Sequence, residues 1–537
     1  MDELNRRHTL KVLATLVGSA FLPSCCLLSG RTSNCEHYQF AHITKPVIDM
    51  HAHFFNATDL MVGEYITGPA LSDFFGDRFE HVRELLKRIA NAIIALATTF
   101  QQHISAENEL RWLKSTDACS VSEEYNTISQ EFYTYVTERE RTKSMSLNNS
   151  LEELRFETLL NRADRELSTS MNKTNPEQYT TPSDIVFTAD TLAKAASVPS
   201  QLQEKTGAAE FSSVCPTDNN AVFRILAFAA RALARRSTNV QAYYDKYSLH
   251  PVNGYGVKHV MNISCDFDFF LGCPQYRSSI ADQIKVHEQI FHHSKGFALP
   301  VLGVNPWKMY HDDDYATLVD NTLKNGIYKG VKLYPSIGYS VSGEIRDGVR
   351  QRKCNGKGIN EKMLAEGMDK LISIVYDRKA YITSHTTYSK AAERGSEKLA
   401  SSKYWVAHLR QRPDLKVNFG HMGDPSDNGG SEWRKGFLSL MSQYENVHAD
   451  FGYHDYDNYD VLKNDLTSFI NDYGVGILKK IAYGSDWYMI SKDEGANAYL
   501  CSASLNFERA VRENVIRDDH LRDMFYNNAV RFLSLKD

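Results

Sequence analysis

The chain has 537 residues, which at about 100–200 residues per domain corresponds to roughly three domains, or fewer if one of them is a barrel. Hydrophobic residues at 42% and charged residues at 24% exclude a disordered protein, and no apolar run reaches the ~20 residues of an internal membrane span. The 61 basic and 66 acidic residues give a net charge of −5, which argues against a nucleic-acid-binding protein. Nine cysteines are too few for a fold built on disulfides.

The N-terminal residues 1–28 have the layout of an export signal. Arg6 and Arg7 precede an apolar stretch from Val12 to Leu22, which is too short to span a membrane comfortably. The paired arginines resemble a twin-arginine signal, and Cys25 stands where a bacterial lipoprotein carries its lipid. We therefore expect a bacterial protein that is periplasmic or anchored to the membrane through an N-terminal lipid. An uncleaved anchor or a wrongly assigned start codon is the alternative.

Export would place the cysteines in an oxidising compartment. Cys119 could then pair with Cys215, or Cys265 with Cys273, but no spacing specifies either bond, and buried free thiols are equally compatible with the sequence.

The sequence between residues 54 and 256 differs from the rest. Residues 78–104 and 221–247 have apolar residues at three- and four-residue spacing, which predicts amphipathic helices. We expect this block to be mainly helical.

The remainder of the chain predicts short, buried strands separated by helices. An apolar stretch at 45–53 precedes the helical block, and seven more follow from residue 257 onward. Eight strand–helix units favour an α/β fold of the (β/α)₈ TIM-barrel type, with the helical block inserted between strands 1 and 2. The expected strands are 45–53, 257–264, 296–304, 330–335, 380–385, 416–421, 446–452 and 480–486.

Two histidines end the first expected strand. Because side chains alternate along a strand, Val47, Asp49, His51 and His53 are expected on one face. Histidines at positions i and i+2 of one strand can bind a single metal ion from the same side. A His-x-His pair alone is a weak signal, because a buried or surface histidine without a ligand is common.

Other polar residues end later strands, where the active site of this barrel type is built. His385 ends the fifth expected strand, and Asp486 ends the eighth. A carboxylate buried there is costly unless a cation neutralises it. Three imidazoles and one carboxylate form a nitrogen and oxygen set suited to zinc or another divalent first-row ion, with a coordination position open to water.

The motifs PVIDMHAHF, GVKLYP, the strand-ending His385, FGHMGD and AYGSDW, in this order, resemble the amidohydrolase superfamily. The closest branch is the amidohydrolase-related group, which contains hydrolases and aminocarboxymuconate-semialdehyde-type decarboxylases. The resemblance covers residues 45–53 and about 257–537, and implies a metal-dependent barrel domain there.

The resemblance also implies roles for individual residues. His51, His53 and His385 correspond to metal ligands on strands 1 and 5, and Asp486 to the strand-8 aspartate, which binds metal and takes a proton from the attacking water. His421 corresponds to the strand-6 histidine, which binds a second metal or acts as a catalytic acid or base.

Lys332 and Tyr334 are expected at the barrel mouth as substrate-binding residues. Three roles remain open for Lys332: a carboxylated bridge between two metals, a contact to a substrate carboxylate, or an ion pair with a buried carboxylate. Tyr334 could equally form part of the aromatic wall.

These observations predict a metal-dependent hydrolase, with zinc as the expected metal and an ester, lactone or amide as its small-molecule substrate. A non-oxidative decarboxylase would use the same ligands, and a catalytically inactive surface binding protein is the third alternative. The block at 54–256 follows His53 directly and must emerge at the catalytic end of the barrel, so we expect it to form a cap over the substrate pocket. A domain that leans away and contacts a partner or the membrane is the alternative.

Overall fold

The computed structural model describes most of the chain after residue 37. The described residues are 38, 40–60, 80–115, 121–144, 159, 160, 162, 163, 221–273, 278–389, 392, 395–424, 431–492 and 498–535. The expected export signal at 1–28 lies outside them, as do Cys119 and Cys215.

Eight parallel strands form one sheet whose order follows the sequence from β1 to β8. Each strand pairs with the next in parallel. All eight expected strands are present, and the predicted (β/α)₈ class is confirmed. The bounds are β1 Lys45–Ala52, β2 Tyr255–Ile263, β3 Ala298–Gly303, β4 Gly330–Leu333, β5 Tyr381–His385, β6 Lys416–Gly420, β7 Val447–Asp450 and β8 Ile481–Ala482.

The first and last strands close the barrel through backbone hydrogen bonds. The amide of Met50 donates to the carbonyl of Tyr483 at 2.9 Å, and the amide of Asp486 donates to the carbonyl of His51 at 2.7 Å. A parallel bridge between Ala52 and Trp487 extends this seam. The seam therefore runs through two of the candidate ligands.

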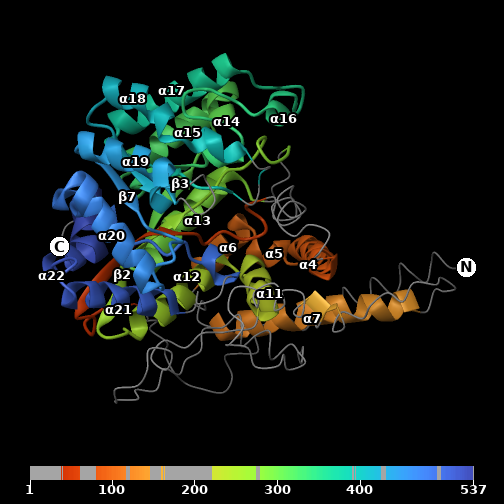
Figure 1. Cartoon of the computed structure of the whole chain (residues 1–537). Helices are drawn as coiled ribbons and strands as arrows, with labels where there is room; N and C mark the ends of the chain where they lie inside the picture. Colours follow the sequence, from red (N-terminus) through yellow and green to blue (C-terminus); the bar gives the residue numbers. More distant parts are fainter. Residues whose placement is uncertain are drawn as a thin grey trace, which may run out of the picture. The chain divides into compact units, whose positions relative to one another are not determined.

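Helices alternate with the strands from β2 onward (Figure 1). Several begin at residues whose side chain accepts a hydrogen bond from the first turn, as Ser279, Asn305, Asp312, Asn360 and Asn458 do. The helices are α13 Ile280–His293, α14 Pro306–His311, α15 Asp313–Lys324, α16 Asp347–Arg350, α17 Glu361–Asp377, α18 Val406–Gln411, α19 Ser431–Gln443, α20 Tyr459–Tyr473, α21 Tyr499–Arg512, α22 Asp518–Arg522 and α23 Asn528–Leu533.

An irregularity in β1 changes which residues face the barrel interior. Ile48 and Met50 belong to a buried cluster that also contains residues of β2, β3, β5, β8 and α23, and strands from around the barrel can meet only inside it. The pairing of β1 with β2 shifts register between Asp49 and Ala52. Such a bulge re-aims the following side chains. The expectation that Asp49 shares a face with His51 and His53 is therefore wrong.

Helices also fill the described part of the chain between β1 and β2. The amphipathic helices expected at 78–104 and 221–247 are present. The bounds are α4 Glu80–Thr99, α5 Gln101–Ile104, α6 Ala106–Leu113, α7 Val121–Ser144, α11 Ala221–Ala232 and α12 Arg236–Tyr244, followed by one π-helical turn, η3 Asp245–Leu249. None of the helices in the described residues is long and apolar enough to cross a membrane.

A buried ion cluster ties these helices to the chain that follows β1. The guanidinium of Arg236 at the start of α12 is fully buried. It donates to Glu109 of α6 at 2.6 Å and, through its Nε, to Asp59 at 2.8 Å. Each of the three buried charges in this cluster therefore lies next to a charge of opposite sign.

Candidate metal centre

The polar residues that end the strands converge at one end of the barrel. His51 lies in β1 and His53 directly after it, Lys332 lies in β4, and His385 is the last residue of β5. His421 follows β6, and Asp486 follows β8. All six are buried, with at most 7% of their surface exposed.

His51, His53 and Asp486 form a set of three donors with the spacing of metal ligands. One donor atom from each lies within 4.8 Å of the others. Asp486 Oδ1 is 3.3 Å from His53 Nε2 and 3.8 Å from His51 Nε2. Donors about 2.0–2.2 Å from one ion at near-tetrahedral angles lie about 3.3–3.6 Å apart. Two imidazoles and a carboxylate at this spacing fit a divalent first-row ion.

The remaining nitrogen of each strand-1 histidine has its own acceptor. His53 Nδ1 donates to the carbonyl of Ile263 at 3.0 Å. His51 Nδ1 lies 3.1 Å from both oxygens of Asp450. Both rings therefore present Nε2 to Asp486, as ligating histidines usually do when a hydrogen bond fixes the other nitrogen.

His385 and His421 form a separate pair beside this set. His421 Nδ1 donates to the carbonyl of Gly452 at 2.8 Å, so its Nε2 accepts the hydrogen bond from His385 Nδ1 at 3.0 Å. His385 is in neither of the two groups of potential ligands found among the described residues. Its part as a third imidazole ligand stays a prediction.

The backbone is strained at two of the candidate residues. His421 has φ 67° and Asp486 has φ 57°, both in the left-handed region that non-glycine residues seldom adopt. Such conformations cost about 1–3 kcal/mol each and gather at functional sites. Here they turn the chain at the ends of β6 and β8, where the two side chains enter the site.

Lys332 reaches the same site from β4. Its Nζ donates to His51 Nε2 at 2.9 Å and lies 5.4 Å from the centre of the Tyr334 ring. Burial lowers the pKa of the Lys332 ammonium. The Tyr334 ring stacks on the His385 ring with their centres 4.0 Å apart. Both expected substrate-binding residues thus border the candidate ligands.

Electrostatic interactions keep Asp486 ionised. Burial opposes its charge, but the hydrogen bond with His53 and the neighbouring histidines hold the pKa of the Asp486 carboxyl below its usual range. Burial also acts on His53, where Cys265 and Asp486 outweigh it and raise the pKa to about 9. Burial and Lys332 lower the pKa of His51 to about 3, despite Asp450. A bound cation would favour the neutral form of both imidazoles.

Sequence reasoning missed Asp450, the last residue of β7. The sequence predicts a strand at 446–452, NVHADFG, and the carboxylate near the end of this strand is the available signal. Asp450 is fully buried. Burial opposes its charge, but His51, His421 and Asn418 hold the pKa of its carboxyl below the usual range.

Asp49 acts outside the barrel interior. Its carboxylate accepts hydrogen bonds from the His51 amide at 3.0 Å, from the amide and hydroxyl of Ser485, and from the hydroxyl of Tyr243 in α12. It therefore joins β1 to the segment after β8 and to the helices between β1 and β2.

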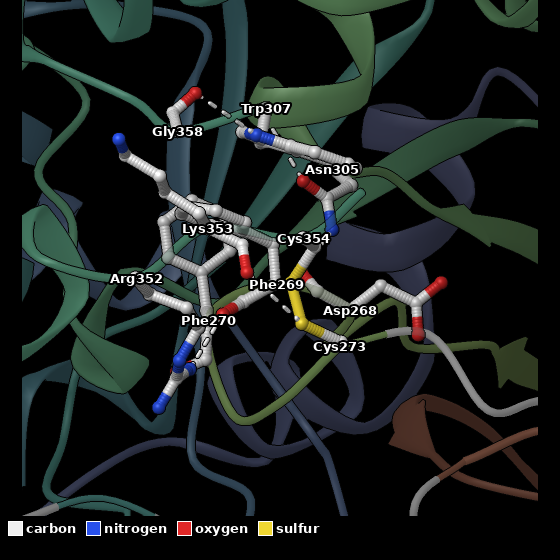
Figure 2. The surroundings of a disulfide bond; sticks show 10 residues. All are labelled: Asp268, Phe269, Phe270, Cys273, Asn305, Trp307, Arg352, Lys353, Cys354 and Gly358. Carbon is white, nitrogen blue, oxygen red and sulfur yellow. Dashed lines mark hydrogen bonds between the residues drawn. A yellow bond between two sulfur atoms is a disulfide. The ribbon is translucent and has the colours of Figure 1, made fainter. Parts of the chain in front are cut away.

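A disulfide holds two loops that follow strands at the same end of the barrel as the site. Cys273, after β2, is bonded to Cys354, after β4, and the Arg352 guanidinium donates to the carbonyls of Phe269 at 2.5 Å and Phe270 at 2.6 Å (Figure 2). The alternative pairing of Cys265 with Cys273 is wrong, because Cys265 is a buried free thiol.

The two loops joined by the disulfide are linked to the candidate site through aromatic contacts. The Phe270 ring lies 4.4 Å from that of Tyr339, whose hydroxyl accepts a hydrogen bond from the Tyr334 amide at 2.9 Å. Phe267 packs edge-on against Tyr334 at 4.9 Å. The Tyr334 ring, which stacks on His385, is therefore held in place by residues that lie next to the disulfide.

Helix α11 contacts the chain on the other side of the site. The Phe228 ring lies 5.3 Å from Tyr488, which is two residues after Asp486, and the Arg231 guanidinium lies 5.5 Å from the Trp487 ring. Tyr488 also packs against Phe55, at 5.2 Å. Side chains from between β1 and β2 thus pack against the segment that carries Asp486.

Residues 401–535 match the family model described as amidohydrolase. The matched segment contains His421, Asp450 and Asp486. The predicted resemblance to the amidohydrolase superfamily is confirmed. The amidohydrolase family is one of metal-dependent hydrolases, so the prediction of an enzyme of this class is confirmed as well. The match does not reach the part of the barrel that carries His51, His53, Lys332 and His385.

Solved structures of similar proteins are distant from this chain. An amidohydrolase with bound zinc from Burkholderia multivorans is 11% identical, with 52% of this chain and 84% of that chain covered at a TM-score of 0.33. A 4-oxalomesaconate hydratase from Rhodopseudomonas palustris is 12% identical, with 51% and 76% covered at a TM-score of 0.32. A dihydroorotase from Campylobacter jejuni is 14% identical, with 52% and 75% covered at 0.31. No curated protein matches the chain.

Proposed function

We propose that the protein hydrolyses a small ester, lactone or amide at a zinc site formed by His51, His53 and Asp486, with His385 as a further ligand. The observation that carries the proposal is the Asp486 carboxylate, which lies 3.3 Å from His53 Nε2 and 3.8 Å from His51 Nε2 at the mouth end of the barrel. A divalent ion bound there would polarise the substrate carbonyl and lower the pKa of water.

The protein's own residues divide the proton transfers. The Asp486 carboxylate stays ionised and accepts the proton of the attacking water. His421 lies next to the ligands; its Nε2 would take this proton from Asp486 and pass it to the leaving group. Its ring is oriented by the hydrogen bond from Nδ1 to the carbonyl of Gly452.

Lys332 and Tyr334 would bind the substrate. The Lys332 ammonium is buried and lies 2.9 Å from His51 Nε2, close enough to the candidate ligands to attract an anionic or carbonyl oxygen of a bound molecule. Tyr334, stacked on His385, offers an aromatic face next to it.

The test combines metal analysis with a substrate panel. The purified protein is expected to carry about one zinc per chain and to cleave a member of a panel of esters, lactones and amides. Asp486→Asn should abolish turnover, whereas Asp266→Asn, a buried carboxylate that binds Lys308 at 2.7 Å instead, should retain it. Release of carbon dioxide from a carboxylate substrate would identify the decarboxylase alternative. Active protein without metal would refute the proposal.

We also propose that the chain is exported, and that Cys25 anchors it to the membrane through a lipid. Disulfides persist in oxidising compartments, and the Cys273–Cys354 bond supports an exported location. Replacing Arg6 and Arg7 by Lys should retain the protein in the cytoplasm, and Cys25→Ala should release it from the membrane fraction. Unchanged fractionation of the double Lys variant would contradict export.

The helices between β1 and β2 are proposed to cap the substrate pocket. Contacts of α11 with Trp487 and Tyr488 support this role. Phe228→Ala should change the relative kcat/KM of large and small substrates while the zinc content stays the same. Phe132→Ala, in the buried face of α7, is the control for loosening these helices in general. Equal effects of both substitutions on substrate preference would contradict the cap.

A further inference from the structure

The carboxylate of Asp450 lies against the Nδ1 side of the His51 ring. Both carboxylate oxygens lie 3.1 Å from His51 Nδ1. The same carboxylate accepts hydrogen bonds from Asn418 Nδ2 at 2.7 Å and from the amides of Gly452 at 3.1 Å and His421 at 3.2 Å. Asp450 is thus held in place from β6 and from its own loop, independently of the imidazole.

The other nitrogen of His51 identifies the tautomer. Lys332 Nζ lies 2.9 Å from His51 Nε2, and an ammonium group can only donate. His51 Nε2 must therefore accept, and Nδ1 carries the proton that is donated to Asp450. Contacts on the two sides of the ring, from β4 and from β7, agree on one tautomer.

Three glycines lie directly against the His51 ring and the Asp450 carboxylate. A Cβ atom at Gly420 would lie 2.7 Å from His51 Cε1, and one at Gly484 would lie 3.0 Å from Asp450 Oδ1. A Cβ at Gly452 would also lie 3.0 Å from the same oxygen. A side chain at any of these three positions would collide with the ring or the carboxylate, which are therefore closely enclosed on these sides.

We propose that Asp450 is a positioning residue that holds His51 in the Nδ1–H tautomer with Nε2 directed at His53 and Asp486, a role that rests on the proposed metal site. Asp450 is not itself a ligand, although it lies within 4.8 Å of donor atoms of His51 and His421. Its two oxygens already accept hydrogen bonds from four donors. A carboxylate behind a ligating imidazole orients the ring and increases its basicity.

Zinc affinity of the metal-free full chain is the first readout, measured by competition with a chromophoric chelator. Asp450→Asn should weaken zinc binding about 10–100-fold. Asp266→Asn, a buried carboxylate that contacts none of the candidate ligands, should change it less than about twofold. In a His51→Ala background the effect of Asp450→Asn should disappear, which a purely structural role would not produce. A folded Asp450→Asn protein that binds zinc as tightly as the wild type would overturn the proposal.

A second readout needs neither the variant nor the metal. Nitrogen-15 NMR of histidine-labelled, metal-free wild-type protein should find the His51 proton on Nδ1, with the signals assigned by their loss in His51→Gln. A proton on Nε2 would overturn the proposal even if Asp450→Asn fails to fold. If the wild type binds no zinc but has the Nδ1–H tautomer, the proposed function fails while the positioning of His51 by Asp450 stands.

Discussion

Replacing Cys273 and Cys354 together by Ser removes one covalent link between the loops after β2 and β4 and leaves the hydrogen bonds of Arg352 in place. The two cysteines are separated by 81 residues. In the chain-entropy model, a closed loop of this length restricts the unfolded chain by about 4.5 kcal/mol at 25 °C. We expect the double variant to lose a large part of this free energy of unfolding, about 2–4 kcal/mol.

The assay is urea unfolding followed by tryptophan fluorescence, since Trp307 stacks on Phe269 next to the disulfide. Wild type in the presence of a reductant is the matched control. Cys501 is also disulfide-bonded, and a reductant breaks that bond in both proteins. In the wild type the reductant also breaks the Cys273–Cys354 bond, so the two reduced proteins lack the same bonds and their unfolding curves should nearly coincide. A loss below about 0.5 kcal/mol under oxidising conditions would refute the reasoning, because it would mean that the link does not constrain the unfolded chain.

Three further predictions concern other parts of the molecule. Arg236→Met removes the cation opposite two buried carboxylates, so it should lower the free energy of unfolding by about 3–5 kcal/mol in a urea titration. Arg378→Met is the control: it breaks an exposed ion pair of similar geometry and should lower the free energy of unfolding by only about 0–1 kcal/mol. Gly420→Ala places a methyl group against the His51 ring and should weaken zinc binding about tenfold, with unchanged affinity as the contrary result. Burial lowers the pKa of His287 from 6.5 to about 3, so its contribution to stability is complete above pH 6.5 and is lost as the pH falls toward 3. Unfolding of His287→Gln should therefore depend less on pH in this range, and identical pH profiles would contradict the assignment.

The barrel strands could be predicted because a parallel strand buried on both faces is a short apolar run. VKHVMNIS and KVNFGH are such runs, and the strands were found within a few residues of the expected bounds. The eighth strand is shorter than expected, at Ile481–Ala482, although Tyr483 and Asp486 beyond it still form backbone hydrogen bonds with β1.

The candidate site was predictable only where a residue ends a strand. This rule placed His51, His53 and Asp486 together, as the structure has them. It could not foresee that Asp49 faces Tyr243 rather than the barrel interior, because a bulge in β1 depends on pairing with residues some 200 positions away. It also gave no means of ranking Asp450, whose importance comes from one contact with His51.

The candidate ligands bridge the two ends of the barrel sequence, and this sets an order of events during synthesis. His51 and Asp486 come from the first and last strands, and the neighbouring Asp49 and Ser485 are 436 positions apart. At 5–20 residues per second, roughly 20–90 s pass on the ribosome between the appearance of the first donors and the last. Until then the chain lacks both the closing seam and the Asp486 carboxylate. At the proposed metal site, an ion would therefore be bound only after Asp486 has been made, and the compartment in which β8 docks would decide which metal is captured.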